Sequence, residues 1–530
     1  MRAVVVVVAA LLTLAFTAPY ATLNQATYLL DPIHRAYPEL FHCDWLVSET
    51  PPYHPVFGWL VQWLYVLDGD GAIAMLAAHI AVTIASYAAV YWLVSALIPG
   101  WRVFAIVAGH VALTRNITIG GSYMFSGYFQ PSSLGTLGWL VAMAAFVRGR
   151  YMLCGCALAI GGALHVNFLV LGIGLFTLAA VARRDLALVD HVKLLAPQLV
   201  VLACFVPFLL RAAGPSDEAV WILTEFHAPL HYLPARLLPW LDQLFVWPLA
   251  GIGALYLLRG DQRALALCRF LVIASAIILA TTLVSAYTPY IAITQLFWSR
   301  MAPFAQLAAQ VLIVCALVKH VDDPQPLTRR ARILVGISFI VPLWTIYAHV
   351  HVMVGLCATA VGSALIVIAL APWPRIARGA VVALAVTLPL FALWRSPHGA
   401  GLTRAPAVWR DELGVERWVQ AHTHTDALFL APPSLYKFRL MARRAVVADL
   451  KSPPLRPDLL VQWYHRICAM VRLPNARSSR EIETHYYELT PDELLEVAHA
   501  FSADYIIRPI GPWPKPPVFA NATFAVYHVR

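Results

Sequence analysis

A polar loop that follows the first hydrophobic segment contains residue types that acid–base chemistry needs. It includes Asp31, Asp44 and His54. The apolar segment 4–16 precedes the loop, and the loop runs directly into the apolar and aromatic segment 56–67. Carboxylates held between such segments at a membrane surface can take a proton from a membrane-anchored substrate. The loop is therefore the first candidate for a catalytic site.

Asp44 is the first choice for a catalytic base, because Cys43 and Trp45 flank it and place it near apolar surface. Loss of hydration there raises the pKa of a carboxyl group toward the range in which it is an effective base. Asp31, at the head of an amphipathic stretch, is the second choice. The alternative is an ordinary surface loop with solvated acids.

Other polar residues are expected at the outer membrane boundary or inside the membrane. Positive charge is disfavoured at the outer boundary, so an arginine there needs a reason. Its guanidinium can bind a phosphate group bidentately, and the alternative is contact with lipid headgroups. A polar pair inside the membrane is a functional candidate, with helix-to-helix hydrogen bonding as its alternative. The candidate substrate-binding residues are His54, Arg300, Arg115, Arg211, His165 and Asn167.

The composition indicates which elements must position these residues. Hydrophobic residues make up 60% of the 530 residues and charged residues 12%, whereas soluble domains are about half apolar and a quarter charged. Apolar runs of about 18 residues recur along the first three-quarters of the chain, which predicts a polytopic helical membrane protein. The net charge of +10 lies mostly in short loops between apolar runs. This is an orientation signal and not a nucleic-acid-binding stripe.

The basic loops predict the topology. With a cytoplasmic N-terminus, all of them are cytoplasmic if residues 152–182 form a hairpin of two short helices, broken near the Gly161-Gly162 pair. This gives about thirteen spans, and segment 56–67 is then a helix along the interface. An uncleaved first helix is favoured over a cleaved signal peptide, and both place the first outer loop, residues 21–55, on the same side. The cytoplasmic loops are 183–193, 259–269, 319–332 and 375–378.

The chain divides into a transmembrane domain, residues 1–398, and a small extracytoplasmic α/β domain, residues 399–530. The tail has the composition of a soluble domain, and its apolar segments alternate between strand and helix patterns. Cys43 and Cys468 are the two cysteines in predicted extramembrane segments, and two cysteines do not establish a disulfide. Strands are expected at 427–430, 445–448, 505–507 and 524–529, and helices at 434–441 and 493–501.

The first loop shows a rhythm of acid, aromatic residue and a proline-rich entry to an interfacial helix. Its parts are Tyr28, Pro38-Glu-Leu-Phe, Asp44-Trp45 and Pro51-Pro-Tyr-His-Pro55-Val-Phe. With about thirteen spans and an α/β tail, the chain resembles the C-type (GT-C fold) membrane glycosyltransferases. These include oligosaccharyltransferase catalytic subunits, protein O-mannosyltransferases and aminoarabinose transferases of lipid A. The architectural resemblance covers nearly the whole chain.

The resemblance implies inverting transfer of a sugar from a polyprenyl-phosphate donor to a lipid, glycan or protein acceptor on the extracytoplasmic face. A first-loop aspartate would deprotonate the acceptor hydroxyl while phosphate leaves. Arg300 is the leading candidate to stabilise the leaving charge. The implied partners are the lipid-linked donor and membrane lipids, without nucleic acid. The implied location is a bacterial cytoplasmic (inner) membrane.

Two departures from the family pattern leave alternative functions possible for this chain. Many relatives place an Asp-Glu pair directly after the first helix, and this chain has Asn24-Gln25 near that position. The second outer loop has no acid between Asn116 and Ser133, so no metal ligand is assigned and a divalent metal stays an unsupported option. The alternatives are a lipid or glycan transporter or flippase, or a non-catalytic membrane scaffold. A transporter more often shows two matched halves, and we find none.

Overall fold

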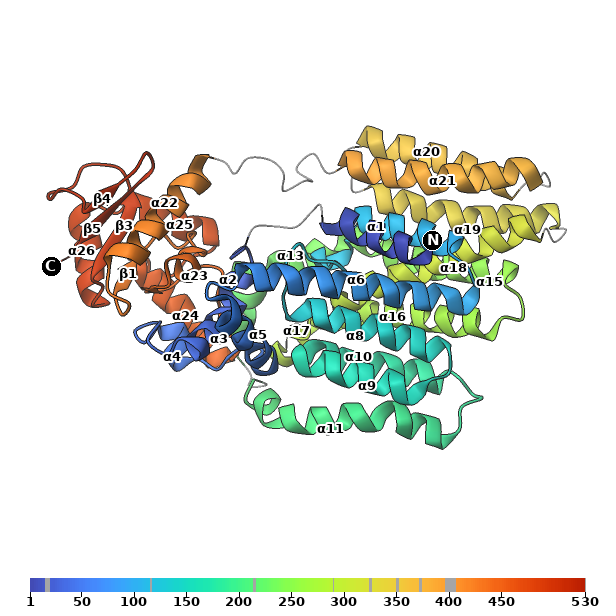
Figure 1. The fold of residues 1–530 in the computed structure, drawn as a ribbon, viewed down its shortest axis with the longest axis horizontal. Helices are drawn as coiled ribbons and strands as arrows, with labels where there is room; N and C mark the ends of the chain where they lie inside the picture. The colour runs from blue at the N-terminus through green and yellow to red at the C-terminus, as the bar shows by residue number, and fades with distance from the viewer. Residues whose placement is uncertain are drawn as a thin grey trace.

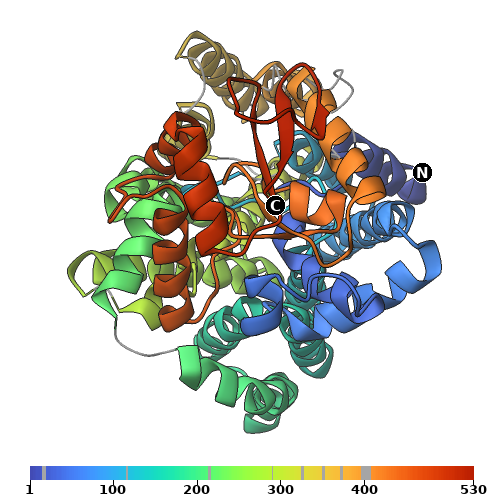
Figure 2. The same cartoon turned by 90° about the vertical axis from the view of Figure 1, so that its left-hand side faces the viewer.

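The structure, a computed structural model, is a long bundle of helices with a mixed α/β unit at one end (Figure 1). Viewed from that end, the α/β unit covers the end of the bundle (Figure 2). The described residues are 1–14, 20–114, 117–212, 216–288, 290–323, 327–348, 352–370, 374–395 and 407–529.

Apolar helices make up the bundle. Four of them are long and apolar enough to cross a membrane: α6 (Ala72–Leu97), most of α11 (Leu188–Ala212), α16 (Gln262–Tyr287) and η4 (Trp298–Met301) continued by α18 (Ala302–Asp322). Further helices complete the bundle: α1 (Arg2–Leu14), α7 (Arg102–Thr114), α8 (Pro131–Val147), α9 (Tyr151–Leu164), α10 (Val166–Val181), α15 (Asp242–Leu257), α19 (Arg329–Ala348), α20 (Val352–Ala369) and α21 (Pro374–Arg395). The expected count of about thirteen spans stays a prediction.

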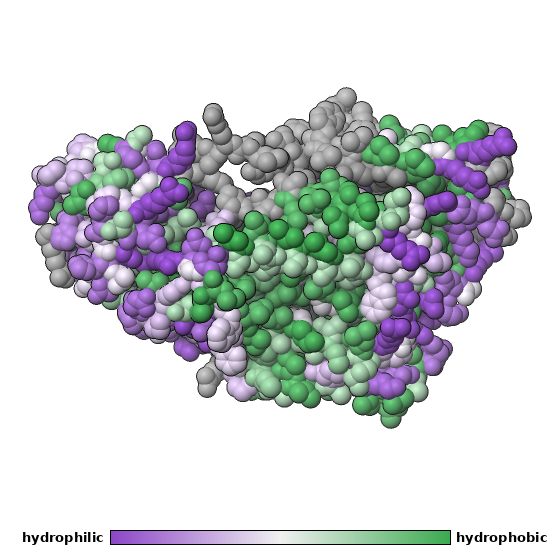
Figure 3. All heavy atoms as spheres, in the orientation of Figure 1, coloured by the Kyte–Doolittle hydropathy of each residue, from purple (hydrophilic) through white to green (hydrophobic). Residues whose placement is uncertain are grey.

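The surface of the bundle carries an apolar band. Figure 3 shows hydrophobic residues across the middle of the bundle, with hydrophilic residues at its far end and over the α/β unit. Exposed apolar side chains are stable only in lipid or against a partner, and a band of this kind matches a bilayer between two aqueous phases. With its long apolar helices, the chain is an integral membrane protein.

The expected break within residues 152–182 is confirmed. Helix α9 ends at Leu164, α10 begins at Val166, and His165 between them has an extended backbone. The preceding glycine pair permits close helix packing, because a Cβ atom on Gly138 of α8 would lie 3.0 Å from the Cα atom of Gly161 and 2.8 Å from the Ala157 carbonyl oxygen. Small residues let helix backbones approach in this way within membranes.

Short helices and loops lie at the end of the bundle that faces the α/β unit. The first loop contains α2 (Gln25–Tyr28), α3 (Leu30–Ala36), α4 (Trp45–Glu49) and α5 (Pro55–Asp68). Helix α5 matches the expected interfacial helix and begins at a proline, whose fixed φ suits the first helical turn. The later segments at this end contain η1 (Ile119–Gly121), α12 (Asp217–Trp221), the π-helix η2 (Ile222–His227), α13 (Pro229–Tyr232), α14 (Pro234–Leu237), η3 (Leu238–Trp240) and α17 (Ile291–Thr294).

The C-terminal unit contains a five-stranded sheet in the order β2-β1-β3-β5-β4. Strands β2, β1 and β3 are parallel, and β5 and β4 are antiparallel to their neighbours. Four strands lie within a few residues of their expected positions, whereas β4 was not expected. The strands are β1 (Leu428–Leu430), β2 (Ala445–Val446), β3 (Tyr505–Pro509), β4 (Phe519–Ala520) and β5 (Phe524–His528). The helices are α22 (Ala407–His422), α23 (Phe438–Ala442), α24 (Pro457–Met470), α25 (Ser479–Glu488) and α26 (Pro491–Ala500).

One hydrophobic core joins the first loop to the C-terminal unit. Buried Phe41 and Trp45 of the loop, Phe226 of η2 and Trp463 of α24 belong to the same cluster. Rings from η2 and α24 contact one another at 6.1 Å between the centroids of Phe226 and Trp463. The C-terminal unit is therefore packed onto the first loop and η2. Cys43 and Cys468 are both free thiols.

The close contact of α8 and α9 gives a first prediction. Gly138→Leu places a side chain against the α9 backbone, so the helices must separate, at a cost of about 1–3 kcal/mol for an overpacked site. The matched control is Gly174→Leu, because a Cβ atom on Gly174 meets no atom within 4 Å. Thermal unfolding in detergent micelles is expected to show a lower Tm for Gly138→Leu alone. Equal melting temperatures would contradict the packing argument.

Candidate functional site

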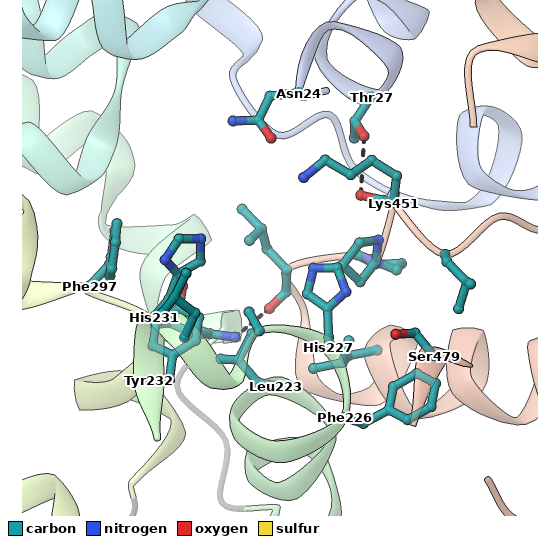
Figure 4. Close-up of a pocket in the computed structure, with 18 of the residues that line it drawn as sticks. Asn24, Thr27, Leu223, Phe226, His227, His231, Tyr232, Phe297, Lys451 and Ser479 are labelled. Atoms are coloured by element: carbon teal, nitrogen blue, oxygen red, sulfur yellow. Dashed lines mark hydrogen bonds between the residues drawn. The ribbon is translucent and has the colours of Figure 1, made fainter. Parts of the chain in front are cut away.

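A cavity of about 540 Å³ lies where the bundle, the first loop and the C-terminal unit meet (Figure 4). Four segments far apart in the sequence line it. They are the first loop (Asn24, Thr27, Tyr28 and Tyr53), the outer segment of η2 and α13 (Leu223 and 226–232), the segment before α18 (Gln295, Phe297 and Arg300), and the C-terminal unit (Ser434, Tyr436, Leu450, Lys451, 453–455, Leu460 and Ser479). The cavity is thus assembled only in the tertiary structure.

Two cationic side chains reach the cavity from opposite parts of the chain. Arg300 comes from η4 and Lys451 from the C-terminal unit, and none of the described lining residues is an aspartate or glutamate. Burial lowers the pKa of Lys451, while Asp449 two residues earlier opposes this shift. An unbalanced pair of cations in a partly buried site favours an anionic ligand.

The segment that carries Lys451 is fixed by contacts with the outer loops. The hydroxyls of Thr27 and Ser452 lie 2.9 Å apart, and Tyr53 donates a hydrogen bond to the Pro453 carbonyl. Gln295 donates to the Leu455 carbonyl at 2.6 Å. The chain directly after Lys451 is therefore held by contacts with two other segments.

Arg300 is positioned by an aromatic and histidine cluster. Its Nη1 atom donates to Nε2 of His165 at 2.8 Å, and its guanidinium lies over the rings of Phe168 and Phe297 at 5.4 and 5.2 Å. Because arginine has no acceptor, Nε2 of His165 must accept and its proton must sit on Nδ1. The ring of His54 lies 4.5 Å from that of His165. Three predicted residues, His54, His165 and Arg300, are thus brought together.

The remaining predicted binding residues have other positions. Asn167 does not line the cavity, but its amide donates to the Gln295 carbonyl at 3.2 Å and so supports the segment leading to Arg300. Arg115 lies outside the described residues, and the side chain of Arg211 is also outside them. Their proposed roles stay predictions.

Asp31 and His54 lie beside a smaller cavity of about 60 Å³. Thr27, Tyr28 and Tyr53 line both cavities and separate Asp31 from the larger one. Both oxygens of the Asp31 carboxylate accept from the single N–H of Arg35 Nε, at 3.0 and 2.9 Å. Burial, with Arg300 adding to it, lowers the pKa of His54 to about 3, so its imidazole is neutral at pH 7.

Asp44 lies outside the cavity lining, in contrast to its expected place beside a substrate. Its carboxylate caps α4 by accepting from the Leu46 amide, and it also accepts from the Val446 amide in the C-terminal unit. Arg439 forms ion pairs with Asp44 at 2.8 Å and with Asp449 at 2.9 Å. Burial raises the pKa of Asp44 as the sequence predicted, and Arg439 opposes the shift. The structure gives Asp44 a contact that joins loop and tail.

Two cavity histidines, His227 and His231, were not singled out from the sequence. The π-helix η2 and the following α13 place them four residues apart on the cavity wall. A ring nitrogen of His227 bonds to the Leu450 carbonyl, and Nδ1 of His231 bonds to the Gly120 carbonyl at 2.6 Å. Their i, i+4 spacing in a long aromatic outer loop was the available signal. No group of three or more possible metal ligands occurs among the described residues.

Comparisons with known proteins give limited similarity. A family model described as a domain of unknown function (DUF6798) matches residues 410–470. No curated protein matches the chain. Among solved structures, ArnT from Cupriavidus metallidurans bound to undecaprenyl phosphate is 14% identical, with 99% of this chain and 97% of that chain covered and a TM-score of 0.47. The apo state of ArnT gives 14% identity, 99% and 96% coverage and a TM-score of 0.45. Similarity this low carries no argument about activity.

The buried ion pairs give a second prediction. Arg439→Met leaves two buried carboxylates without their cation and is expected to lower the free energy of unfolding by about 3–5 kcal/mol. The matched control is Arg35→Met, which removes the partly exposed pair with Asp31 and is expected to cost about 0–1 kcal/mol. Thermal unfolding and limited proteolysis between bundle and tail would measure both. Equal effects of the two variants would contradict a docking role for Arg439.

Proposed function

We propose that the chain is an integral-membrane glycosyltransferase that binds a polyprenyl-phosphate sugar in the cavity and transfers the sugar to an acceptor hydroxyl. The observation that carries this proposal is the convergence of Arg300 and Lys451 on a cavity whose described lining has no carboxylate. The resemblance of the first loop to the C-type glycosyltransferases supplies the reaction class.

The unmet hydrogen-bonding capacity of Arg300 supports an anionic ligand. Its Nε atom is buried and has no hydrogen-bond partner among the described residues, which is costly for a charged donor. The part of the guanidinium that lines the cavity can donate to a phosphate oxygen, and a second oxygen can accept from Lys451. The two cations would then stabilise the negative charge that develops when the phosphate leaves the sugar.

Apolar and aromatic side chains support a lipid-linked ligand. Phe226, Leu230 and Leu455 line the cavity, and the last two are also exposed on the protein surface. They offer contact for the first isoprene units, while Tyr28 and Tyr53 offer ring faces and hydroxyls to a sugar. The cavity thus combines the apolar and polar contacts that such a donor needs.

The basic residues at the other end of the bundle support the proposed orientation. Arg148 and Arg150 lie over the ring of Trp92, Arg183 lies over that of Tyr151, and Arg263 bonds to the Ala96 carbonyl. These contacts show that several basic residues, which the sequence predicts on one side of the membrane, lie together at this end of the bundle. By the positive-inside rule we propose that this side is cytoplasmic, and that the cavity and the C-terminal unit lie on the extracytoplasmic side of a bacterial inner membrane.

A second candidate function is binding of a lipid phosphate without catalysis. It is favoured by Asn24, whose uncharged amide lines the cavity at a position where the resemblance leads one to expect an acid. The amide donates to the Gln130 side chain at 3.1 Å and cannot act as a base. Donor turnover separates the two candidates.

The two cations give a third prediction. Lys451→Gln and Arg300→Gln each remove a charged donor worth about 1.5–3 kcal/mol, so the Kd for undecaprenyl phosphate is expected to rise about 10- to 100-fold. The controls are Lys515→Gln and Arg417→Gln, which change exposed residues of the C-terminal unit. Binding can be measured with radiolabelled lipid and purified protein in detergent. Unchanged affinity in both cavity variants would overturn the proposal.

A further inference from the structure

A transferase that works at this cavity needs a base from a residue other than the expected aspartates. Asp44 is held by Arg439, and Asp31 is separated from the cavity and bonded to Arg35. The described lining contains two imidazoles that can take up a proton, those of His227 and His231. A base needs an unprotonated ring nitrogen that faces the cavity, so the tautomer of each imidazole matters.

His231 has the geometry of an oriented base. Since a carbonyl oxygen can only accept, its bond to Gly120 places the imidazole proton on Nδ1 and leaves a lone pair on Nε2. The ring packs edge-on against Phe297 at 4.8 Å. Gly120 is itself constrained, because its φ is +68° and a Cβ atom there would lie 2.5 Å from Oγ of Ser299. The backbone conformation at Gly120 therefore holds in place the carbonyl that determines the tautomer of His231.

Charges around His231 keep it neutral before reaction. Burial lowers its pKa, the hydrogen bond to Gly120 opposes the shift, and Arg300 and Lys451 both add to it. His227 is the other titratable histidine near His231. The ring centroid of Tyr232 lies 6.1 Å from that of His231. Figure 4 shows His231 and Lys451 on different sides of the cavity, with Asn24 at a third. Among the two histidines, His231 is the one affected by both cations.

We propose that His231 is the catalytic base of the transfer, in place of a carboxylate; this inference rests on the proposed function. Nε2 takes the proton of the acceptor hydroxyl as the hydroxyl oxygen bonds to the anomeric carbon. The bond from that carbon to the phosphate oxygen breaks, and polyprenyl phosphate leaves with the electron pair. The products are the glycoside, polyprenyl phosphate and an imidazolium that later releases its proton to solvent.

The charges balance within the cavity during this step. The donor phosphodiester carries one negative charge, and polyprenyl phosphate gains a second as it leaves. At the same moment His231 gains one positive charge. The imidazolium therefore forms when the negative charge of the phosphate offsets the positive charges of Arg300 and Lys451 most strongly. These two cations lower the pKa of His231 before the reaction, but they do not prevent its protonation during the step.

The test uses hydrolysis of radiolabelled polyprenyl-phosphate sugars by the purified full-length protein, with water as the acceptor. His231→Gln can keep a donor near Gly120 but cannot take a proton, so turnover is expected to fall about 10²- to 10⁴-fold while undecaprenyl phosphate still binds. In the wild type, kcat/KM is expected to fall as the pH drops through the lowered pKa of His231, and the variant is expected to lack this acid limb. Added imidazole is expected to restore turnover to His231→Ala. His424→Gln, an exposed change in the tail, is the control.

Several results would overturn the inference. If turnover is unchanged in His231→Gln, the base is another residue. Loss of turnover in Asp31→Asn would assign the base to Asp31, and loss of the acid limb in His227→Gln would assign it to His227. Binding of undecaprenyl phosphate without hydrolysis of any donor would reject catalysis by His231 and leave a lipid-phosphate-binding protein. Absence of lipid binding in the folded wild type would instead reject the proposed function.

Discussion

Arg439 of the C-terminal unit contacts Asp44 of the first loop and Asp449 of its own unit, and all three side chains are almost fully buried. A buried cation shared by two carboxylates stabilises a structure only in one geometry, because any displacement leaves a charge without its partner. This contact therefore fixes the position of the tail on the loop. Lys451, two residues after Asp449, reaches the cavity from a backbone that the contact helps to hold.

The same constraint decides how the polar residues are used. Asp44 joins two parts of the chain and so is not available to a substrate, and Asp31 is bonded to Arg35. The cavity is left with two cations, neutral histidines and amides. Such a lining suits binding of phosphate, and in the proposed transfer the imidazole of His231 takes the proton in place of a carboxylate.

The membrane gives the cavity its setting. The apolar band lies across the middle of the bundle (Figure 3). The cavity lies where the bundle, the first loop and the C-terminal unit meet, and Arg300 there is partly buried. Charged groups there lie between lipid and an aqueous phase, where electrostatic interactions are stronger than in water. A lipid-linked phosphate could reach this level without leaving the bilayer.

The sequence by itself determined the features that depend on local pattern. Apolar runs predict the helices, the polar break predicts the boundary at His165, and strand positions near β1, β2, β3 and β5 follow from alternation. His165 was identified as a polar residue inside a membrane segment, Arg300 as a positive charge at an expected outer membrane boundary, and His54 by its place before Pro55 in the first loop. The cavity was decided only by the tertiary structure, because Arg300 and Lys451 meet through long-range packing that no spacing encodes. The position of Asp44 also depends on long-range packing. Its neighbours in the sequence predicted a raised pKa, but its ion-pair partner Arg439 lies about 400 residues further along the chain.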